Sequence, residues 1–395
     1  MAERGHQLHV ATTRAKISNP LPPNVHVYEK VHALDCSQPR TLSYLLWSQS
    51  VLAHVRRRRQ IDLIHELNPV RSLCSLAFAG SSIPVILGPH SSRWPASTAQ
   101  LRLPARICQE TKAVFKDIIV RQQHRRACAI LLSTPAALNN ISRPDELPGR
   151  IFLLPPGLDT DTFSPAPSSA QYPPTVLFLA NVLARKGIFT LLEAFQLLTP
   201  RLPNARLLVA GDGGELDAAR NFVAASPCAS HVSFIGRVDR PQVPEVMRQC
   251  TVYCMPSRGE PFGMTAIEAM ACGKPLVVTD VGGLGHIVSD QGGRRVPVDD
   301  PPRLAYALEE LLSQPELCRR MGAHNRLEAE RTYAWPIVAQ RLEEIYRTVL
   351  DLAGGIAAGQ AMAAGATTAN GGTRAQEEPL SASCILQSNL QERLL

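Results

Sequence analysis

Short apolar runs alternate along the chain with longer stretches in which apolar residues recur every three or four positions. In the first half, the short runs cover residues 7–12, 61–66, 83–90, 128–134 and 150–156. Continuous apolar runs of this length are typical of strands that are covered on both faces. Helical spacing is found between them at residues 43–57 and 105–126. The alternation predicts an α/β fold with mainly parallel sheets.

A second series of the same kind follows after residue 174. Strands are expected at residues 175–181, 205–213, 231–238, 251–257 and 275–280, and helices at 188–198, 243–250, 263–272 and 301–312. Another helix is expected over residues 335–352, where the apolar positions keep helical spacing. Residues 155–174, between the two series, are rich in Pro, Ser and Asp, which indicates a crossing between two domains.

These patterns divide the chain into four parts. Residues 1–158 are expected to form one α/β domain and residues 159–335 a second, followed by a closing helix over residues 336–353. Residues 354–395 are rich in Ala, Gly, Thr, Ser and Gln and show little periodicity. Such a composition predicts a disordered C-terminal tail.

Composition fits a soluble globular protein without a membrane-spanning helix, since no apolar run reaches about 18 residues. The ten cysteines are scattered without a C-x-x-C pair, so neither a disulfide framework nor a zinc site is indicated. Cys250 and Cys254 lie in an apolar run and are expected to be buried thiols in a reducing cytoplasm.

The net charge of +7 permits attraction to anionic lipids or phosphorylated substrates. The densest basic run, Arg56–Arg59, is interpreted as a solvated helix end, and the absence of interleaved aromatic residues argues against a nucleic-acid partner. Residues 112–126 are basic and helix-like. They leave open a peripheral contact with the inner face of a membrane, with an ordinary solvated helix as the alternative.

The stretch "GEPFGMTAIEAMACGKP", residues 259–275, holds two carboxylates, Glu260 and Glu268, eight positions apart. Gly263 permits a tight turn into a helix that begins near Met264, and the free N–H groups of a helix N-terminus suit a phosphate. Carboxylates accept hydrogen bonds from sugar hydroxyls, so the pair suits an elongated ligand. The alternative is that both glutamates are solvent-facing charges.

Other candidate residues also follow predicted strands. Gly282 and Gly283 come directly after the run at 275–280, and Arg185 and Lys186 come after the run at 175–181. In open parallel sheets, ligands bind at the carboxyl ends of the strands, and paired glycines permit a close approach. The glycine-rich turn at residues 209–216 lacks the G-x-G-x-x-G spacing of a dinucleotide site and is interpreted as a simple turn.

The order of these motifs resembles the donor domain of the family-4 glycosyltransferases, which are retaining enzymes of the GT-B fold. The likeness covers residues 153–350 through "LLPPGLDTDTFSP", "LARKGIFTLLEAF", "LLVAGDGGEL", "VSFIGRV" and the stretch that contains Glu260 and Glu268. The first half is similar more weakly, through "RGHQLHVAT", "DLIHELNP", "IPVILGPHSSRWP" and "AILLSTPAALNNI". The resemblance implies two Rossmann-like domains that face one another across a cleft, an acceptor domain and then a donor domain.

The implied reaction moves a sugar from a nucleotide-diphosphate sugar, such as a UDP- or GDP-sugar, to a hydroxyl of a carbohydrate or lipid-linked acceptor. It retains the anomeric configuration and belongs to cell-surface polysaccharide or glycolipid synthesis. Arg185 and Lys186 would neutralise the leaving diphosphate in place of a metal ion, so neither a metal nor a cofactor is expected. Domain closure over residues 155–174 would exclude water.

The resemblance also gives each site residue a role. Glu268 would hold the ribose, Glu260 would hold the sugar hydroxyls, and His90 would approach the sugar from the first domain. The remaining donor-binding residues would contact the sugar, the phosphates or the base: Phe262, Gly263, Met264, Thr265, Gly282, Gly283, Asn181, Gly236, Arg237 and Val238.

Three departures from the family pattern bear on these roles. Ala180 and Asn181 stand where the family has Gly-Arg, and His286 stands where it has a glutamate. The family's opening strand, glycine loop and helix before "RGH" are not found, which we expect to reflect a late start of the gene model. The alternative is a weak or inactive nucleotide-sugar-binding protein. A GT-B phosphorylase or a sugar-phosphate synthase is a second enzyme class, although no lysine context for a pyridoxal cofactor is evident.

Overall fold

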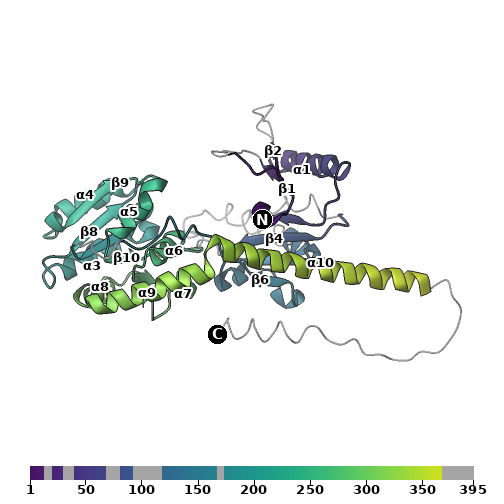
Figure 1. The fold of residues 1–395 in the computed structure, drawn as a ribbon. Coiled ribbons are helices and arrows are strands. Elements are labelled where there is room, and N and C mark those ends of the chain that lie inside the picture. Colours follow the sequence, from purple (N-terminus) through teal and green to yellow (C-terminus); the bar gives the residue numbers. More distant parts are fainter. Residues whose placement is uncertain (13–19, 30–39, 68–80, 92–117, 167–172, 367–395) are drawn as a thin grey trace, which may run out of the picture.

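Two α/β domains lie side by side in the computed structural model, which describes residues 1–12, 20–29, 40–67, 81–91, 118–166 and 173–366 (Figure 1). Every strand pair found in this part of the chain is parallel. The prediction of mainly parallel sheets is therefore confirmed.

The N-terminal domain contains a four-stranded sheet and a separate two-stranded sheet. The larger sheet has the order β3 (Ile64–Glu66), β4 (Val85–His90), β5 (Ala129–Leu132), β6 (Ile151–Leu153). The smaller one pairs β1 (Leu8–Thr12) with β2 (Val25–Glu29). Each of the five apolar runs predicted as strands forms one, whereas β2 was not predicted.

Helices in the N-terminal half agree with the predicted positions as far as they are described. Helix α1 (Arg40–Arg56) covers most of the predicted 43–57 segment, and the basic run that follows it is exposed, as expected. Of the helix predicted over 105–126, residues 118–126 are helical, and the rest lies outside the described residues.

The C-terminal domain has one six-stranded sheet with helices on both faces. Its strand order is β12 (Gly293–Val296), β11 (Leu276–Thr279), β10 (Val252–Met255), β7 (Thr175–Leu179), β8 (Arg206–Ala210), β9 (Val232–Gly236). Its helices are α3 (Ile188–Leu198), α4 (Leu216–Ala224), α5 (Val243–Arg248), α6 (Met264–Ala271), α7 (Leu284–Ile287), α8 (Pro301–Ser313) and α9 (Pro315–Thr332). The five strands and four helices predicted here are all present, and β12, α4, α7 and α9 are additional.

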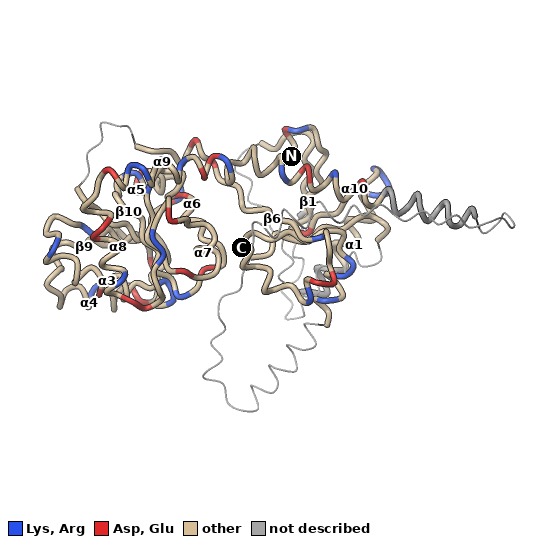
Figure 2. The backbone as a smooth tube through the Cα atoms, turned by 90° about the horizontal axis from the view of Figure 1, so that it is seen from below, with Lys and Arg blue, Asp and Glu red and all other residues tan. Residues whose placement is uncertain are grey.

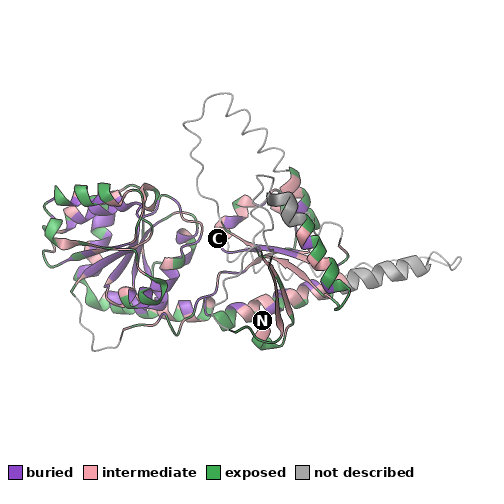
Figure 3. Cartoon of the chain, turned by 90° about the horizontal axis from the view of Figure 1, so that it is seen from above, coloured by how far each residue is buried: buried purple, intermediate pink, exposed green. Residues whose placement is uncertain are grey.

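Burial follows from the apolar spacing of the helices. In α3, Ile188, Leu191, Leu192, Phe195 and Leu198 recur at helical spacing and are all fully buried against α8 and one face of the sheet. Helices α5, α6 and α9 cover the other face. Figure 3 shows the result, with buried positions concentrated in the strands and exposed positions on the outer sides of the helices. A sheet covered on both faces explains the continuous apolar strands of the sequence.

The chain passes between the domains twice, and the two passages pair with each other. Leu158, on the way out, forms an isolated parallel bridge with Ala334 on the way back. The Leu158 N–H donates to the Tyr333 carbonyl over 2.7 Å, and the Trp335 N–H donates to the Leu158 carbonyl over 3.1 Å. Of the predicted 155–174 crossing, residues 167–172 lie outside the described residues.

The last helix, α10 (Trp335–Ala366), returns to the N-terminal domain (Figure 1). Val338, Ile345 and Val349 are buried in one cluster with residues of β4 and β5. The Tyr346 hydroxyl lies 2.6 Å from Nδ1 of His65 on β3. The helix continues beyond the predicted start of the tail at residue 354, and residues 367–395 lie outside the described residues.

Candidate functional site

The loops after β7 and β10 meet because these strands are neighbours in the sheet. After β7 the chain runs through the short 3₁₀ turn η5 (Ala184–Lys186) to Gly187, whose φ of 74° lies in the left-handed region. A Cβ at this position would lie 1.8 Å from the Pro256 carbonyl oxygen. The Arg258 N–H donates to the Arg185 carbonyl over 2.9 Å. These contacts fix the end of η5 against the loop that follows β10.

This junction brings Lys186 and Glu260 together. Lys186 Nζ lies 2.5 Å from Oε2 of Glu260, and the two side chains are only 12% and 10% exposed. The sequence places both residues at strand ends but does not predict that they pair. A charge-assisted hydrogen bond in a site this dry is stronger than one in water. The pair therefore holds both side chains in a defined position.

Helix α6 begins directly beside this pair. Gly263 has a φ of 106°, which turns the chain into the helix as predicted. On the second helical residue, Thr265, the hydroxyl oxygen accepts a hydrogen bond of 2.6 Å from the buried Tyr253 on β10. Phe262 is buried and packs edge-on against Tyr333, with ring centroids 6.2 Å apart. The positive end of the helix dipole thus lies beside Glu260 on a rigid support.

The loop that contains Gly282 and Gly283 closes over the same turn. The Gly283 N–H donates to the Glu260 carbonyl over 2.8 Å. A Cβ on Gly283 would lie 2.4 Å from the Phe262 carbonyl oxygen and 2.6 Å from its Cα. The neighbouring atoms belong to the backbone, so they cannot move aside as the end of a side chain can. Gly283 is therefore required for this close approach.

Gly283→Ala is expected to lower the free energy of unfolding by about 1–3 kcal/mol, because the added methyl group overpacks the contact with Phe262. Urea-induced unfolding followed by circular dichroism measures it. Gly214→Ala is the matched control, since a Cβ at position 214 meets nothing within 4 Å. Equal stability of the two variants would contradict the close packing of this loop.

Glu268 lies at the centre of α6 and is 1% exposed, which excludes the interpretation as a solvent-facing charge. Arg240, in the 3₁₀ turn η7 (Arg240–Gln242), donates from Nη1 to its Oε1. Burial raises the pKa of the Glu268 carboxyl, while the hydrogen bond and the charge of Arg240 lower it. Oε2 is buried and has no hydrogen-bond partner in the described part of the chain. Sequence reasoning missed Arg240, which is separated from Glu268 by 28 positions.

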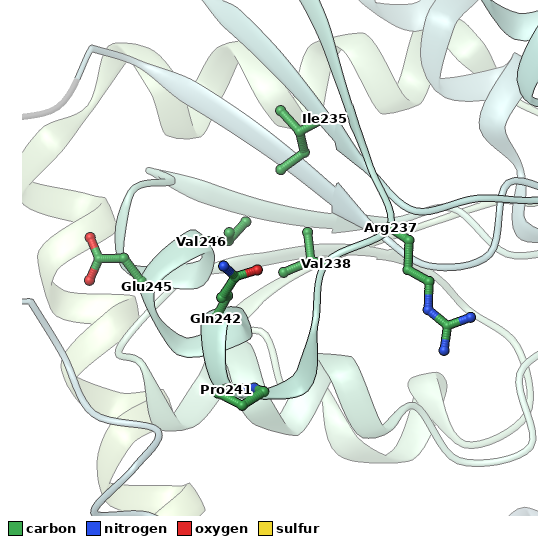
Figure 4. A pocket seen from close by; sticks show the side chains of 7 residues that line it. All are labelled: Ile235, Arg237, Val238, Pro241, Gln242, Glu245 and Val246. Atoms are coloured by element: carbon green, nitrogen blue, oxygen red, sulfur yellow. The ribbon is translucent and has the colours of Figure 1, made fainter.

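An open pocket lies between the end of β9 and α5 (Figure 4). Gly236, with a φ of 70°, ends the strand, and Arg237 and Val238 then line the pocket. The other lining residues are Ile235, Pro241, Gln242, Glu245 and Val246. The mixture of apolar walls and polar edges suits a flat, partly polar ring.

The remaining candidates are distributed over both domains. Asn181 and Arg185 are exposed on the loop after β7, and Met264 is 36% exposed at the start of α6. His90 ends β4 in the other domain, where its ring packs edge-on against His124 with centroids 5.5 Å apart. Its carbonyl accepts the Ser133 N–H over 2.8 Å.

One carboxylate of the N-terminal domain was not singled out from the sequence. Glu66, at the end of β3, has a buried Oε2 without a hydrogen-bond partner in the described part of the chain, and burial raises its pKa to about 7. Its place in "DLIHELNP" shows only that it ends a predicted strand. The loss of hydration that perturbs it arises from tertiary packing, which no local pattern shows.

Charged positions of both signs are interspersed over the C-terminal domain (Figure 2). Many of them form surface pairs, such as Arg201 with Glu309 at 2.8 Å and Arg258 with Asp299 at 2.9 Å. Exposed pairs of this kind contribute about 0–1 kcal/mol each. Glu260, which is partly buried, and Glu268, which is buried, differ from them in exposure and are the polar centre of the site.

Two parallel α/β domains of this arrangement define the GT-B class of glycosyltransferases. Sucrose-phosphate synthase from Thermosynechococcus elongatus superposes with a TM-score of 0.67 at 22% identity, over 89% of this chain and 91% of its own. The Anabaena protein HepE, solved in complex with UDP, gives 0.63 at 17% identity, over 82% and 86%. At these sequence identities, the similarity shows that this chain shares the fold of these proteins.

The family follows from the sequence matches. Residues 1–162 match the model described as "Glycosyltransferase Family 4", and residues 159–328 match "Glycosyl transferases group 1". Phosphatidyl-myo-inositol mannosyltransferase of Mycolicibacterium smegmatis is 33% identical, over 72% of this chain and 70% of that protein. The Mycobacterium leprae protein of the same name is 30% identical, over 88% and 90%. The chain belongs to the family-4 glycosyltransferases and is a glycosyltransferase enzyme.

Proposed function

We propose that this enzyme is a retaining glycosyltransferase that moves a sugar from a nucleotide-diphosphate sugar to an acceptor hydroxyl. The observation that carries the proposal is the site at the carboxyl edge of the C-terminal sheet. There a partly buried lysine–glutamate pair lies at the N-terminus of α6, and the carboxylate of Glu268 is buried just over one turn into that helix. These groups suit the phosphates and hydroxyls of one elongated donor.

Each group has a place along this donor. The base lies in the pocket beside Arg237 and Val238, and the ribose hydroxyls bind Glu268. The diphosphate lies against Arg185, Lys186 and the start of α6. The HepE structure, which was solved with UDP, supports a nucleotide in this fold.

Catalysis in this scheme is mainly electrostatic. As the bond to the sugar breaks, negative charge develops on the diphosphate, and Lys186 and the α6 dipole stabilise it without a metal ion. Glu260 accepts hydrogen bonds from the sugar hydroxyls and shares Lys186 with the phosphates. His90 approaches the sugar from the other domain, and the acceptor hydroxyl attacks on the face that the diphosphate leaves, which retains the configuration.

The acceptor we propose is lipid-linked, in glycolipid or cell-surface polysaccharide synthesis. The support is the printed name of the mycobacterial relatives, which act on phosphatidyl-myo-inositol. Among the described residues no helix has the length and apolar character to cross a bilayer. We propose that the enzyme works in the cytoplasm and meets a lipid-linked acceptor at the inner face of the membrane.

A donor screen tests the proposal. The purified chain is incubated with a panel of UDP- and GDP-sugars and vesicles that contain phosphatidylinositol, with and without a chelator of divalent cations. We expect release of nucleoside diphosphate from one donor, a lipid product with the anomeric configuration of that donor by NMR, and no effect of the chelator.

The other outcomes separate the alternatives. An inverted product would reject the retaining mechanism, and loss of turnover with the chelator would reject the role of Lys186 as a substitute for a metal. Binding of UDP or GDP without turnover on any acceptor would support the nucleotide-sugar-binding protein instead.

A further inference from the structure

The carboxylate of Glu268 is held from outside the helix by one cation. Arg240 Nη1 donates to Oε1, and the Arg240 side chain is 63% exposed whereas that of Glu268 is 1% exposed. The contact joins η7, which follows β9, to the middle of α6. An arginine at the surface therefore reaches inward to a carboxylate that solvent does not reach.

A second contact fixes the same guanidinium. It lies over the ring of Phe163, 4.9 Å from the centroid. Phe163 is itself held, because its N–H donates to the Asp159 carbonyl over 3.0 Å and its carbonyl accepts Nη1 of Arg326 over 2.7 Å. The cation–π contact and the ion pair together restrain the guanidinium of Arg240.

Glu268 needs such a partner because its surroundings disfavour a charge. Burial raises the pKa of its carboxyl, and Arg240 opposes that rise. Among the described residues, Tyr253 of β10 and Cys272 at the end of α6 also interact electrostatically with Glu268, and neither has a positive charge. Removal of a carboxylate from water without a cation is unfavourable by several kcal/mol, and the group then takes up a proton instead.

The arrangement leaves one oxygen for a ligand. Oε1 is taken by Arg240, whereas Oε2 is buried and without a hydrogen-bond partner in the described part of the chain. A buried acceptor without a partner is unfavourable in the free protein and is satisfied by a donor group of a ligand. A ribose hydroxyl supplies such a group.

We propose that Arg240 is a positioning residue of the donor site, which holds Oε1 of Glu268 and so presents Oε2 to a ribose hydroxyl of the nucleotide. The inference rests on the proposed function, in which Glu268 binds the ribose. Arg240 acts through Glu268 and does not itself contact the donor. The interdomain connection, through Phe163, sets the position of Arg240.

Calorimetric titration of Arg240→Gln with UDP and with GDP tests the proposal, across the pH range in which the wild type and the variant both stay folded. We expect affinity to fall about tenfold at the acid end of that range, where a hydrogen bond to a neutral carboxyl replaces one to a carboxylate. Without the guanidinium, the pKa of Glu268 lies higher, so its charged form, and with it the affinity, returns as the pH rises. Arg240→Lys should restore affinity at both ends of the range.

Two further variants serve as controls. Arg240→Met keeps the apolar stem against Phe163 and should show the same pH dependence as Arg240→Gln. Arg201→Gln removes an exposed arginine paired with Glu309 and should leave nucleotide affinity unchanged. Thermal unfolding of each variant confirms that it is folded.

Three results would overturn the proposal. Wild-type affinity in Arg240→Gln at every pH would show that Glu268 does not need this cation. An equal loss at every pH would assign Arg240 to direct contact with the nucleotide. Failure of Arg240→Lys to restore affinity would show that charge is not what matters. If Glu268→Gln also left affinity unchanged, the proposed ribose site itself would fail.

Discussion

Lys186→Met is expected to lower turnover by about 100- to 1,000-fold, the loss typical when one preorganised group that stabilises transition-state charge is removed. The methionine keeps the length of the side chain and removes its charge. In the proposed mechanism the diphosphate then leaves with only Arg185 and the α6 dipole to stabilise it. Steady-state release of UDP or GDP from the identified donor measures the effect.

Lys186→Met also leaves Glu260 without its cation, so a double variant is needed as a control. With Lys186 gone, the Glu260 carboxylate is 10% exposed and without its cation, which lowers the free energy of unfolding by about 3 kcal/mol. The double variant Lys186→Met/Glu260→Gln removes both charges and should recover that stability. If it also recovered turnover, the loss in Lys186→Met would come from the unpaired Glu260 charge, and the role of Lys186 on the diphosphate would be wrong.

Local pattern was sufficient for most of the fold. Helix α3 spans the predicted residues 188–198 because its apolar face and its flanking glycine are both local signals. The turn at Gly263 was also predictable, because a glycine between a strand and a helical repeat marks a sharp change of direction. Elements of weaker pattern, such as the partly exposed β12, were not predicted.

The site was predictable as a set of residues and not as a set of contacts. The sequence placed Lys186 and Glu260 after predicted strands, and the strand order seen in the structure brings the ends of β7 and β10 together. Their pairing depends on the close contact of Gly187 with Pro256, which the sequence does not show. Arg240 reaches Glu268 from a different loop. The sequence therefore singled out the residues that the proposed donor would meet and missed Arg240, which pairs with one of them.

Glu268→Gln is expected to weaken the binding of UDP or GDP by about 10- to 100-fold, the range for a lost hydrogen bond to a charged group. The same variant should be as stable as the wild type or more so above neutral pH. Burial raises the pKa of Glu268 in the folded protein. The free energy of unfolding therefore falls as the pH rises from the pKa of the unfolded state through the pKa of the folded state. A neutral amide removes this loss.

Opposite effects on binding and on stability are what distinguish a binding residue from a structural one here. If the Glu268 carboxylate served the packing of the fold, Glu268→Gln would lower both nucleotide affinity and stability. If the carboxylate serves a ligand, its burial is unfavourable until the ligand binds. Calorimetric titration and thermal unfolding at about pH 8, run on Glu268→Gln and on Glu193→Gln of the exposed face of α3, separate the two. Unchanged nucleotide affinity in Glu268→Gln would remove Glu268 from the donor site and leave its burial beside Arg240 as a structural ion pair.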